Sequence, residues 1–184
     1  MILDNIKFRI LEYFFINPTK KLRIRQIARD TNSPLPSTIR YVKDLVKEEI
    51  LRKEDIAKIV LYSANRSNKN YLLQKKLYNI ESLYHSKIID YLKEYNAQII
   101  ILFGSYSKGE DIEESDIDIY IECKNLPEDL TGFEKKLHRR IQLFKYKNIL
   151  SIENKQLANN IINGLILEGY AEVFKWMKQH GMNA

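Results

Sequence analysis

The sequence predicts an α+β protein of two domains. Near the start, apolar residues recur at helical spacing and are followed by two short runs of strand-forming residues. Further on, the apolar run 99–103 and the alternating segment 115–121 are both typical of strands. We therefore expect a helical domain closed by a β-hairpin over residues 1–66, and a second domain of strands with flanking helices over residues 67–184.

The first domain is expected to contain three helices and then the hairpin. Its apolar residues fall on one side of each expected helix, and proline, asparagine and serine residues separate the helices. The third helix has Ser37 as its candidate N-terminal cap. The expected elements are a helix ending at Asn17-Pro18, helices over 23–30 and about 36–49, and strands over 50–53 and 58–62 around a turn at Glu54-Asp55.

Positive charge is concentrated in the first part of the chain. The whole chain has a formal net charge of +6. Residues 1–100 carry 19 Lys+Arg against 11 Asp+Glu, whereas residues 101–184 carry 11 against 13. The first part is therefore the candidate for contact with a polyanion such as a nucleic acid.

Residues 8–65 resemble the winged helix-turn-helix family of DNA-binding domains. The order of elements, the segment 26–29 and the end of the third helix over 45–51 carry this resemblance. It implies a third helix in the major groove and a hairpin wing near phosphates. The alternatives are a solvated basic face or a domain used for protein contacts. The candidate nucleic-acid-binding residues are Arg23, Arg25, Ser37, Thr38, Arg40, Tyr41, Lys43, Arg52, Lys53 and Lys58.

Two short motifs in the second domain carry the clearest chemistry. Gly104-Ser105 follows the apolar run, ten residues separate Ser105 from Asp116, and Asp118 lies two positions further on. Side chains two residues apart on a strand share one face, so the two carboxylates repel each other unless a cation lies between them. Such oxygen ligands suit Mg²⁺, and a Gly-Ser turn suits close approach of a phosphate. The alternative is a polar strand with two surface aspartates.

This pair of motifs resembles the signature of the DNA polymerase β-like nucleotidyltransferase superfamily, and most closely its minimal nucleotidyltransferase branch. The resemblance covers roughly residues 80–175, with Gly109 one residue later than in the family pattern. It implies a small mixed sheet with helices on one side and an NTP, with ATP favoured, whose phosphates lie on Gly104 and Ser105. Asp116 and Asp118 would be the catalytic residues and would hold Mg²⁺. The implied reaction moves a nucleoside monophosphate onto a hydroxyl of a protein or nucleic acid.

The sequence departs from that family at one position. Active members carry a third carboxylate on the following strand, which fits residues 140–145 here and places Gln142 at the matching position. An amide can bind a metal through its oxygen but cannot act as a general base. Glu122 and Glu153 are the candidates that could substitute for it.

Two longer helices complete the expected second domain. A linking helix over about 69–95 carries an apolar stripe, with Lys75, Lys76, Lys87 and Lys93 expected outside it. A last helix over about 156–178 has a broad apolar face that includes Leu165, Ile166, Val173, Phe174 and Trp176, which makes a homodimer contact plausible.

Two functions of different classes follow. The first is a Mg²⁺-dependent nucleotidyltransferase with a DNA-binding winged helix. The second is a regulator or antitoxin that keeps the nucleotidyltransferase fold with weak or no activity, since the resembling proteins often pair with a small helical ribonuclease-type toxin. Cys123 is the single cysteine, and the sequence shows neither a signal peptide nor a long apolar run, so we expect no membrane partner and a cytoplasmic location.

Overall fold

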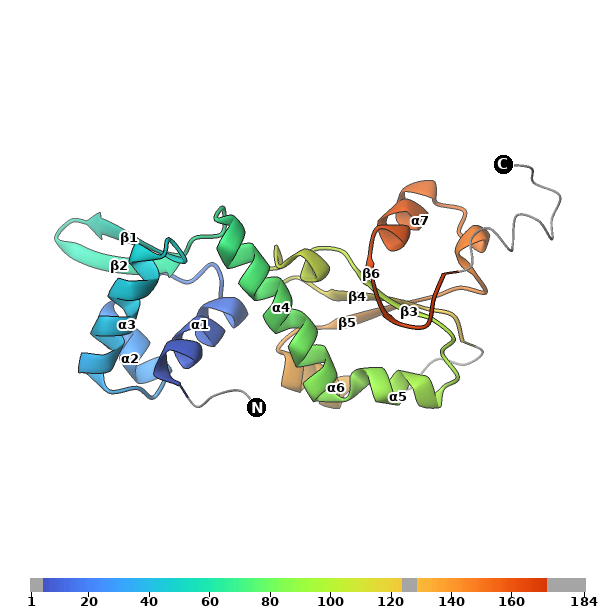
Figure 1. Ribbon diagram of the computed structural model, residues 1–184, viewed down its shortest axis with the longest axis horizontal. Coiled ribbons are helices and arrows are strands. Elements are labelled where there is room, and N and C mark those ends of the chain that lie inside the picture. The colour runs from blue at the N-terminus through green and yellow to red at the C-terminus, as the bar shows by residue number, and fades with distance from the viewer. Residues whose placement is uncertain (1–4, 124–128, 172–184) are drawn as a thin grey trace. The chain divides into compact units, whose positions relative to one another are not determined.

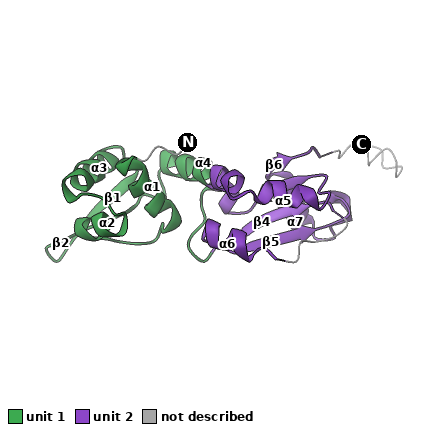
Figure 2. Ribbon diagram, turned by 90° about the horizontal axis from the view of Figure 1, so that it is seen from below, with its two compact units in different colours: residues 1–78, 109–114 green, residues 79–108, 115–184 purple. Residues whose placement is uncertain are grey.

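The computed structural model describes residues 5–123 and 129–171. Their contacts divide the chain into two compact units, shown in different colours in Figure 2. The first unit comprises residues 1–78 and 109–114, and the second comprises residues 79–108 and 115–184. The first unit thus extends beyond residue 66, where the sequence analysis placed the boundary, and it includes a segment that lies far along the chain.

The first unit consists of helices followed by an antiparallel hairpin. The first helix begins after Asn5, whose side chain accepts a hydrogen bond from the Lys7 N–H. The third begins at Leu35 with proline in its first turn, so the predicted cap at Ser37 is wrong. The elements are α1 (Ile6–Ile16), α2 (Ile24–Asp30), α3 (Leu35–Lys47), β1 (Leu51–Ile56) and β2 (Ile59–Ala64), followed by α4 (Lys69–Ser86).

The hairpin turns later than predicted. Glu54 and Asp55 pair with Leu61 and Val60 inside the β1–β2 ladder, so the predicted turn at those residues is wrong. The turn is instead formed at Ala57 and Lys58, both of which have positive φ angles (47° and 68°). Two consecutive residues with positive φ match the right-handed twist of the flanking strands.

Aromatic residues of α4 complete the core of the first unit. Tyr71 is fully buried and donates a hydrogen bond to the Phe14 carbonyl at 2.9 Å. The rings of Tyr71 and Tyr78 both lie against Phe15, with centroid separations of 5.6 and 5.3 Å. The start of α4 is therefore part of this core. The assignment of the unit to the winged helix family stays a prediction.

The second unit is built on a four-stranded mixed sheet, with strand order β5-β4-β3-β6. The β3–β4 and β3–β6 pairs are antiparallel, whereas β4 and β5 are parallel. The elements are α5 (Ile88–Glu94), β3 (Ile100–Phe103), the 3₁₀ helix η1 (Tyr106–Lys108), β4 (Ile117–Ile121), α6 (Thr131–Leu137), β5 (Ile141–Lys145), the 3₁₀ helix η2 (Ile149–Ser151), α7 (Lys155–Ile162) and β6 (Leu165–Glu168).

Both faces of this sheet are covered, which corrects the expectation of helices on one side. Alternate residues of β3 divide between two apolar clusters, with Ile100 and Leu102 in one and Ile101 and Phe103 in the other. The first cluster includes residues of α5 and the end of α6, and the second includes residues of α7. Figure 1 shows α7 on one side of the strands and α5 and α6 on the other. This explains why β3 is apolar at every position.

The predicted linking helix over 69–95 is two helices. Lys87 separates α4 from α5 and has a φ of 70°, a left-handed conformation that ends a helix. The hydroxyl of Ser86 donates to the Leu83 carbonyl at 2.7 Å and accepts from the Ile88 N–H at 3.3 Å. Ser86 thus bridges the end of one helix and the start of the next.

The predicted last helix over 156–178 is also wrong in its second half. Helix α7 ends at Ile162, and Leu165 and Ile166 belong to strand β6. A side chain at Gly164 would collide with the Leu102 carbonyl of β3, so this glycine allows the chain to turn back onto the sheet. Val173, Phe174 and Trp176 lie outside the described residues.

None of the helices in the described part of the chain is both long enough and apolar enough to cross a membrane.

Candidate functional site

Gly104 ends strand β3 directly beside the side chain of Asp118. Its φ of +72° lies in the left-handed region that glycine adopts without strain. A Cβ atom at this position would collide with a carboxylate oxygen of Asp118. Both the backbone conformation and the available space therefore require glycine here.

Ser105 follows at the entrance to the 3₁₀ turn η1. Its carbonyl accepts a hydrogen bond from the Lys108 N–H at 3.1 Å, and the Ser107 hydroxyl donates to the Gly104 carbonyl at 2.8 Å. These bonds fix the turn in which Gly104 and Ser105 lie. Ser105 itself is half-buried, so it remains open to solvent on one side.

Asp118 and Asp116 lie at the start of strand β4, opposite that turn. Asp118 pairs with Phe103 in the β3–β4 ladder, and Asp116 lies just before the strand begins. Burial, and in second place the charge of Asp116, raise the pKa of the Asp118 carboxyl above its ordinary value. Both aspartates are half-buried. Neither has an ion-pair partner within the ranges that the structure describes, and the charge of Asp116 acts on the Asp118 carboxyl.

Gln142 lies on the neighbouring strand at the position that pairs with Asp118. Strands β4 and β5 are parallel, and Asp118 and Gln142 are register partners. Register partners point to the same face of a sheet, so the exposed amide of Gln142 flanks the two carboxylates. The donor set at this end of the sheet is therefore two carboxylates and one amide.

Glu122 lies at the opposite end of β4 and cannot serve this site. It is four residues beyond Asp118, roughly 13 Å along the strand at about 3.3 Å per residue, and it accepts a hydrogen bond from the Tyr120 hydroxyl at 2.6 Å. Glu153, the other candidate for a third carboxylate, is exposed in the segment before α7.

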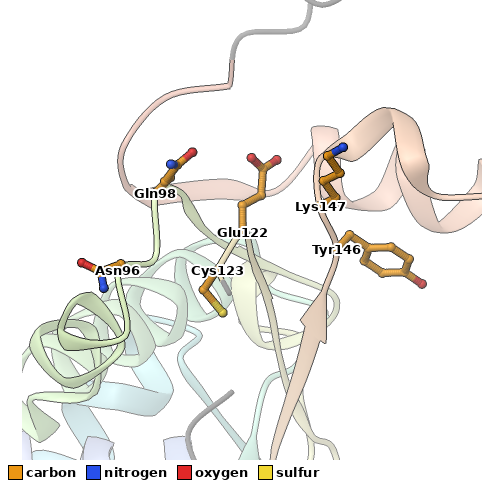
Figure 3. A pocket seen from close by; sticks show the side chains of 6 residues that line it. All are labelled: Asn96, Gln98, Glu122, Cys123, Tyr146 and Lys147. Atoms are coloured by element: carbon orange, nitrogen blue, oxygen red, sulfur yellow. The ribbon is translucent and has the colours of Figure 1, made fainter. Parts of the chain in front are cut away.

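A separate cavity of about 410 Å³ opens at that opposite end of the sheet (Figure 3). Gln98, Glu122 and Lys147 extend to the same side, with Cys123 deeper below them. Burial raises the pKa of the Cys123 thiol. The lining residues are Asn96, Gln98, Glu122, Cys123, Tyr146 and Lys147, and none of them belongs to the Gly-Ser and Asp-x-Asp motifs.

The candidate nucleic-acid-binding residues of the first unit are mostly exposed, with one exception. Thr38 is completely buried, and its hydroxyl donates to the Pro34 carbonyl at 3.0 Å. It cannot contact a ligand in this conformation, so its place in the predicted set is wrong. Ser37 and Tyr41 are half-buried, whereas the basic members are exposed: Arg23, Arg25, Arg40, Lys43, Arg52, Lys53 and Lys58.

Some of these exposed cations already have neighbours. The guanidinium of Arg40 stacks over the Tyr41 ring at 4.5 Å and also donates to its hydroxyl at 2.7 Å. Lys53 pairs with Asp55 at 3.0 Å, and Arg52 donates to the Ser67 hydroxyl. Such exposed contacts are weak and can be exchanged for contacts with a phosphate.

Residues 86–169 match the family described as polymerase beta nucleotidyltransferase. A protein of Methanocaldococcus jannaschii named "Putative protein adenylyltransferase MJ1379" is 38% identical over 90 residues, which is 45% of this chain and 85% of that protein. The chain belongs to the polymerase beta nucleotidyltransferase family. Its resemblance to the nucleotidyltransferase superfamily, first seen in the two motifs, is thereby confirmed.

Two further nucleotidyltransferase relatives come from the same organism. "Putative protein adenylyltransferase MJ1305" is 37% identical over 83 residues, 41% of this chain and 56% of that protein. "Putative protein adenylyltransferase MJ1215" is 39% identical over 72 residues, 39% of this chain and 76% of that protein. The chain thus spans just over half the length of the first of these relatives, and the matched segments cover less than half of this chain.

Sequence reasoning missed one buried pair of charged residues in the first unit. Lys75 was expected outside the apolar stripe of its helix, and its partner is Asp111. Both are buried, and they form an ion pair at 2.7 Å. A signal was present in the sequence, because Lys75 lies between Leu72 and Tyr78 at helical spacing and thus on the side that faces the protein.

Proposed function

We propose that this chain is a Mg²⁺-dependent nucleotidyltransferase that moves AMP from ATP onto a hydroxyl group of a protein. Its main support is the close packing of Gly104 against the carboxylate of Asp118, with Asp116 near enough to raise the pKa of that carboxyl. The family membership and the names of the relatives agree with this proposal.

The donor set fits Mg²⁺. This ion prefers oxygen ligands and is usually held by one or two carboxylates, with waters and substrate phosphates completing its shell. Asp116 and Asp118 supply two carboxylates whose mutual repulsion a divalent cation would relieve. No group of three or more His, Cys, Asp or Glu side chains gathers around a possible metal position in the described residues. The remaining ligands would therefore come from the nucleotide and water.

The residues of the chain would act by holding the triphosphate and the metal in place. Backbone N–H groups of the left-handed turn at Gly104 would donate to phosphate oxygens, and Ser105 would add a hydroxyl. When bound, the metal supplies positive charge that polarises the phosphates. The acceptor oxygen bonds to the α-phosphorus, the bond to the bridging oxygen breaks, pyrophosphate leaves, and the hydroxyl proton passes to solvent.

The test is transfer of label from α-labelled ATP to protein in a cell lysate with Mg²⁺. We expect labelling by the wild type, at least a hundredfold less labelling with Asp116→Ala or Asp118→Ala, and unchanged labelling with Asp90→Ala. Asp90 is an exposed aspartate of α5 that pairs with Lys87 at 3.3 Å, so it is a matched control. Equal labelling by the wild type and Asp116→Ala would rule the proposal out.

A second function, binding of duplex DNA by the first unit, is supported by a different observation. The seven exposed Arg and Lys side chains of the predicted set lie on and around α2, α3 and the hairpin and give this unit a basic surface. Contact with phosphates makes affinity fall steeply as salt rises. This surface is compatible with either an active enzyme or a regulator with a silent nucleotidyltransferase fold.

Binding of a fluorescent DNA duplex over a series of salt concentrations tests this second function. We expect the combined variant Arg25→Ala/Lys43→Ala to bind more weakly and with a shallower salt dependence, because two phosphate contacts are lost. The matched control is Lys87→Ala/Lys93→Ala, just before and within α5, which removes the same charge from the other unit. No binding at low salt would exclude DNA binding.

A toxin partner and a homodimer remain predictions from the sequence. Co-purification from native cells would test the toxin partner, and the molar mass in solution would test the homodimer.

A further inference from the structure

The cavity of about 410 Å³ at the far end of the sheet takes no part in the proposed nucleotide site. All of its lining residues belong to the second unit, so it lies within a single compact body. Its volume is at the low end of the range of about 300–1,000 Å³ that is typical of small-molecule sites. The cavity therefore suits a small ligand.

Backbone contacts fix the strand ends that form this cavity. The Gln98 N–H donates to the Glu122 carbonyl at 2.9 Å, and the Tyr146 N–H donates to the Ile121 carbonyl at 3.3 Å. Gly169 lies directly against the Gln98 carbonyl, where a Cβ atom would collide with it. The ends of neighbouring strands thus hold the lining in place before any ligand binds.

The Glu122 carboxylate is oriented by a tyrosine. The Tyr120 hydroxyl donates to Glu122 Oε1 at 2.6 Å, and the Tyr120 ring stacks on the Tyr146 ring with centroids 6.3 Å apart. Burial, and in second place this hydrogen bond, raise the pKa of the Tyr120 hydroxyl, so it remains a donor near neutral pH. A carboxylate has two acceptor oxygens, so Glu122 Oε2 can accept a hydrogen bond from a ligand.

A positive charge lies on the same side of the cavity as this carboxylate. Figure 3 shows Gln98, Glu122 and Lys147 extending to that side. Among the residues that the structure describes, Glu122 and Lys147 form no ion pair, either with each other or with another group. The cavity therefore presents one negative and one positive group that a ligand can engage together.

These opposite charges limit the class of ligand. A nucleotide or another anion would be attracted by Lys147 but repelled by Glu122, and for a polyamine the reverse would hold. An uncharged ligand would displace water from both charges without compensating them. A zwitterion satisfies both, and hydrogen bonds between charged groups are stronger than those between neutral groups.

We propose that this cavity binds a free α-amino acid, with its ammonium group on Glu122 and its carboxylate on Lys147. An α-amino acid is a small zwitterion whose cationic group donates hydrogen bonds, which the Glu122 carboxylate can accept. The side-chain amides of Asn96 and Gln98 can donate to the ligand's carboxylate or accept from its ammonium group.

This amino-acid site is separate from the nucleotide site. Glu122 lies four residues beyond Asp118 on β4, at the other end of the strand. The inference therefore does not depend on transfer of AMP, and it can be tested by binding alone.

The first experiment measures binding of each standard amino acid to the full chain, by thermal shift and then by isothermal titration calorimetry. We expect at least one of them to bind saturably with one site per chain. Its N-acetyl derivative lacks the ammonium group and its methyl ester lacks the carboxylate, so each should bind about tenfold more weakly or worse. If no amino acid binds the wild type, or if both derivatives bind as well as the parent, the inference is wrong.

The second experiment assigns the two charges with Glu122→Gln and Lys147→Met. Each variant should bind the amino acid about tenfold more weakly or worse. Glu122→Gln should bind the N-acetyl derivative as the wild type does, and Lys147→Met should do the same for the methyl ester, because the matching ligand charge is already absent. Equal losses for parent and derivative would mean that the variants damage the shape of the cavity, which would overturn the assignment.

The matched control is Glu94→Gln/Lys155→Met, which removes an exposed carboxylate and an exposed amine of the same unit that do not line the cavity. It should bind the amino acid as the wild type does. Asp118→Asn should also leave this binding unchanged. Loss of binding in Asp118→Asn, or displacement of the amino acid by ATP, would place the ligand at the nucleotide site and overturn the inference.

Discussion

At the scale of single residues, the candidate site depends on a contact that only glycine permits. Gly104 combines a left-handed backbone with a Cα atom packed on the Asp118 carboxylate. Gly104→Ala should therefore displace Asp118 and add the cost of a left-handed alanine, about 1–2 kcal/mol. We expect a lower melting temperature and loss of AMP transfer, measured by thermal unfolding and by labelling with α-labelled ATP.

Gly132→Ala is the matched control for this prediction. Gly132 lies in the first turn of α6, and among the described residues no atom outside its own helix backbone and chain neighbours lies within 4 Å of where its Cβ would be. Alanine is favoured over glycine in helices by roughly 0.5–1 kcal/mol, so this variant should be as stable as the wild type or slightly more so, with full activity. If both variants retained activity, the contact at Gly104 would have no part in the site.

Asp118 is expected to destabilise the protein when no metal is bound. Its pKa is raised in the folded state, so the folded protein takes up a proton at pH values where the unfolded chain does not. Stability in EDTA should thus rise as the pH falls through the range just above the ordinary aspartate pKa of 3.8. Asp118→Asn removes the charge and should raise the melting temperature near pH 7 by roughly 1–3 °C.

The same variant should lose the response to magnesium. Mg²⁺ with ATP binds the folded state and should raise the melting temperature of the wild type, whereas Asp118→Asn should respond weakly or not at all. A variant that melts below the wild type in EDTA, or that keeps the full response to Mg²⁺, would contradict this prediction.

At the scale of elements, the parallel pairing of β4 and β5 decides what stands beside the two aspartates. Gln142 pairs with Asp118, at the position where the resemblance to the nucleotidyltransferase superfamily implies a third carboxylate. A general base contributes typically 10²–10⁴-fold to a rate, and an amide cannot act as one. Gln142→Asp should therefore raise kcat for AMP transfer by about tenfold or more, with Gln142→Asn as the control of equal size that adds no base.

An unchanged kcat in Gln142→Asp would show that a carboxylate at this position does not contribute to catalysis in this chain. The Gln142 side chain is exposed, so this position can carry a new charge without the cost of burying it.

The elements that could be predicted from the sequence are those with strong periodic or chemical signals. Strands β3 and β4 follow from an apolar run and an alternating run, and the three helices of the first unit follow from apolar spacing ended by polar residues and proline. The misplaced boundaries lack such signals. The hairpin turn at Ala57-Lys58 contains no glycine or asparagine, and the break at Lys87 contains neither glycine nor proline.

Packing explains the remaining errors. Leu165 and Leu167 alternate in β6, as in a strand, but Ile161, Ile162 and Leu165 also fit helical spacing. The sequence pattern therefore fits both a strand and a longer helix. The close contact of the chain with β3 at Gly164 decides for the strand. The Lys75–Asp111 pair joins residues 36 positions apart, and no local pattern reveals a contact at that separation. Close approach and tertiary contacts thus account for the part of the site that the sequence alone does not show.

At the scale of the whole molecule, helix α4 determines where the chain can be divided. Tyr71 is completely buried and its hydroxyl donates to the Phe14 carbonyl, and Tyr78 packs on Phe15 and donates to Glu12 at 3.2 Å. A fragment of residues 1–66 ends before both tyrosines, whereas a fragment of residues 1–86 contains the entire helix. The predicted boundary at residue 66 therefore removes part of a core.

We expect fragment 1–86 to fold and fragment 1–66 to be largely unfolded at 25 °C, as measured by circular dichroism during thermal unfolding. The reason is quantitative: loss of a single large buried aromatic side chain costs about 3–5 kcal/mol, which is a large part of the 5–15 kcal/mol that stabilises a typical domain. Within fragment 1–86, Tyr71→Ala should reproduce most of this loss, while Leu73→Ala, at a position that is 55% exposed on the same helix, should change little. Equal melting of the two fragments would show that the first 66 residues form a complete core, with α4 attached only to its surface.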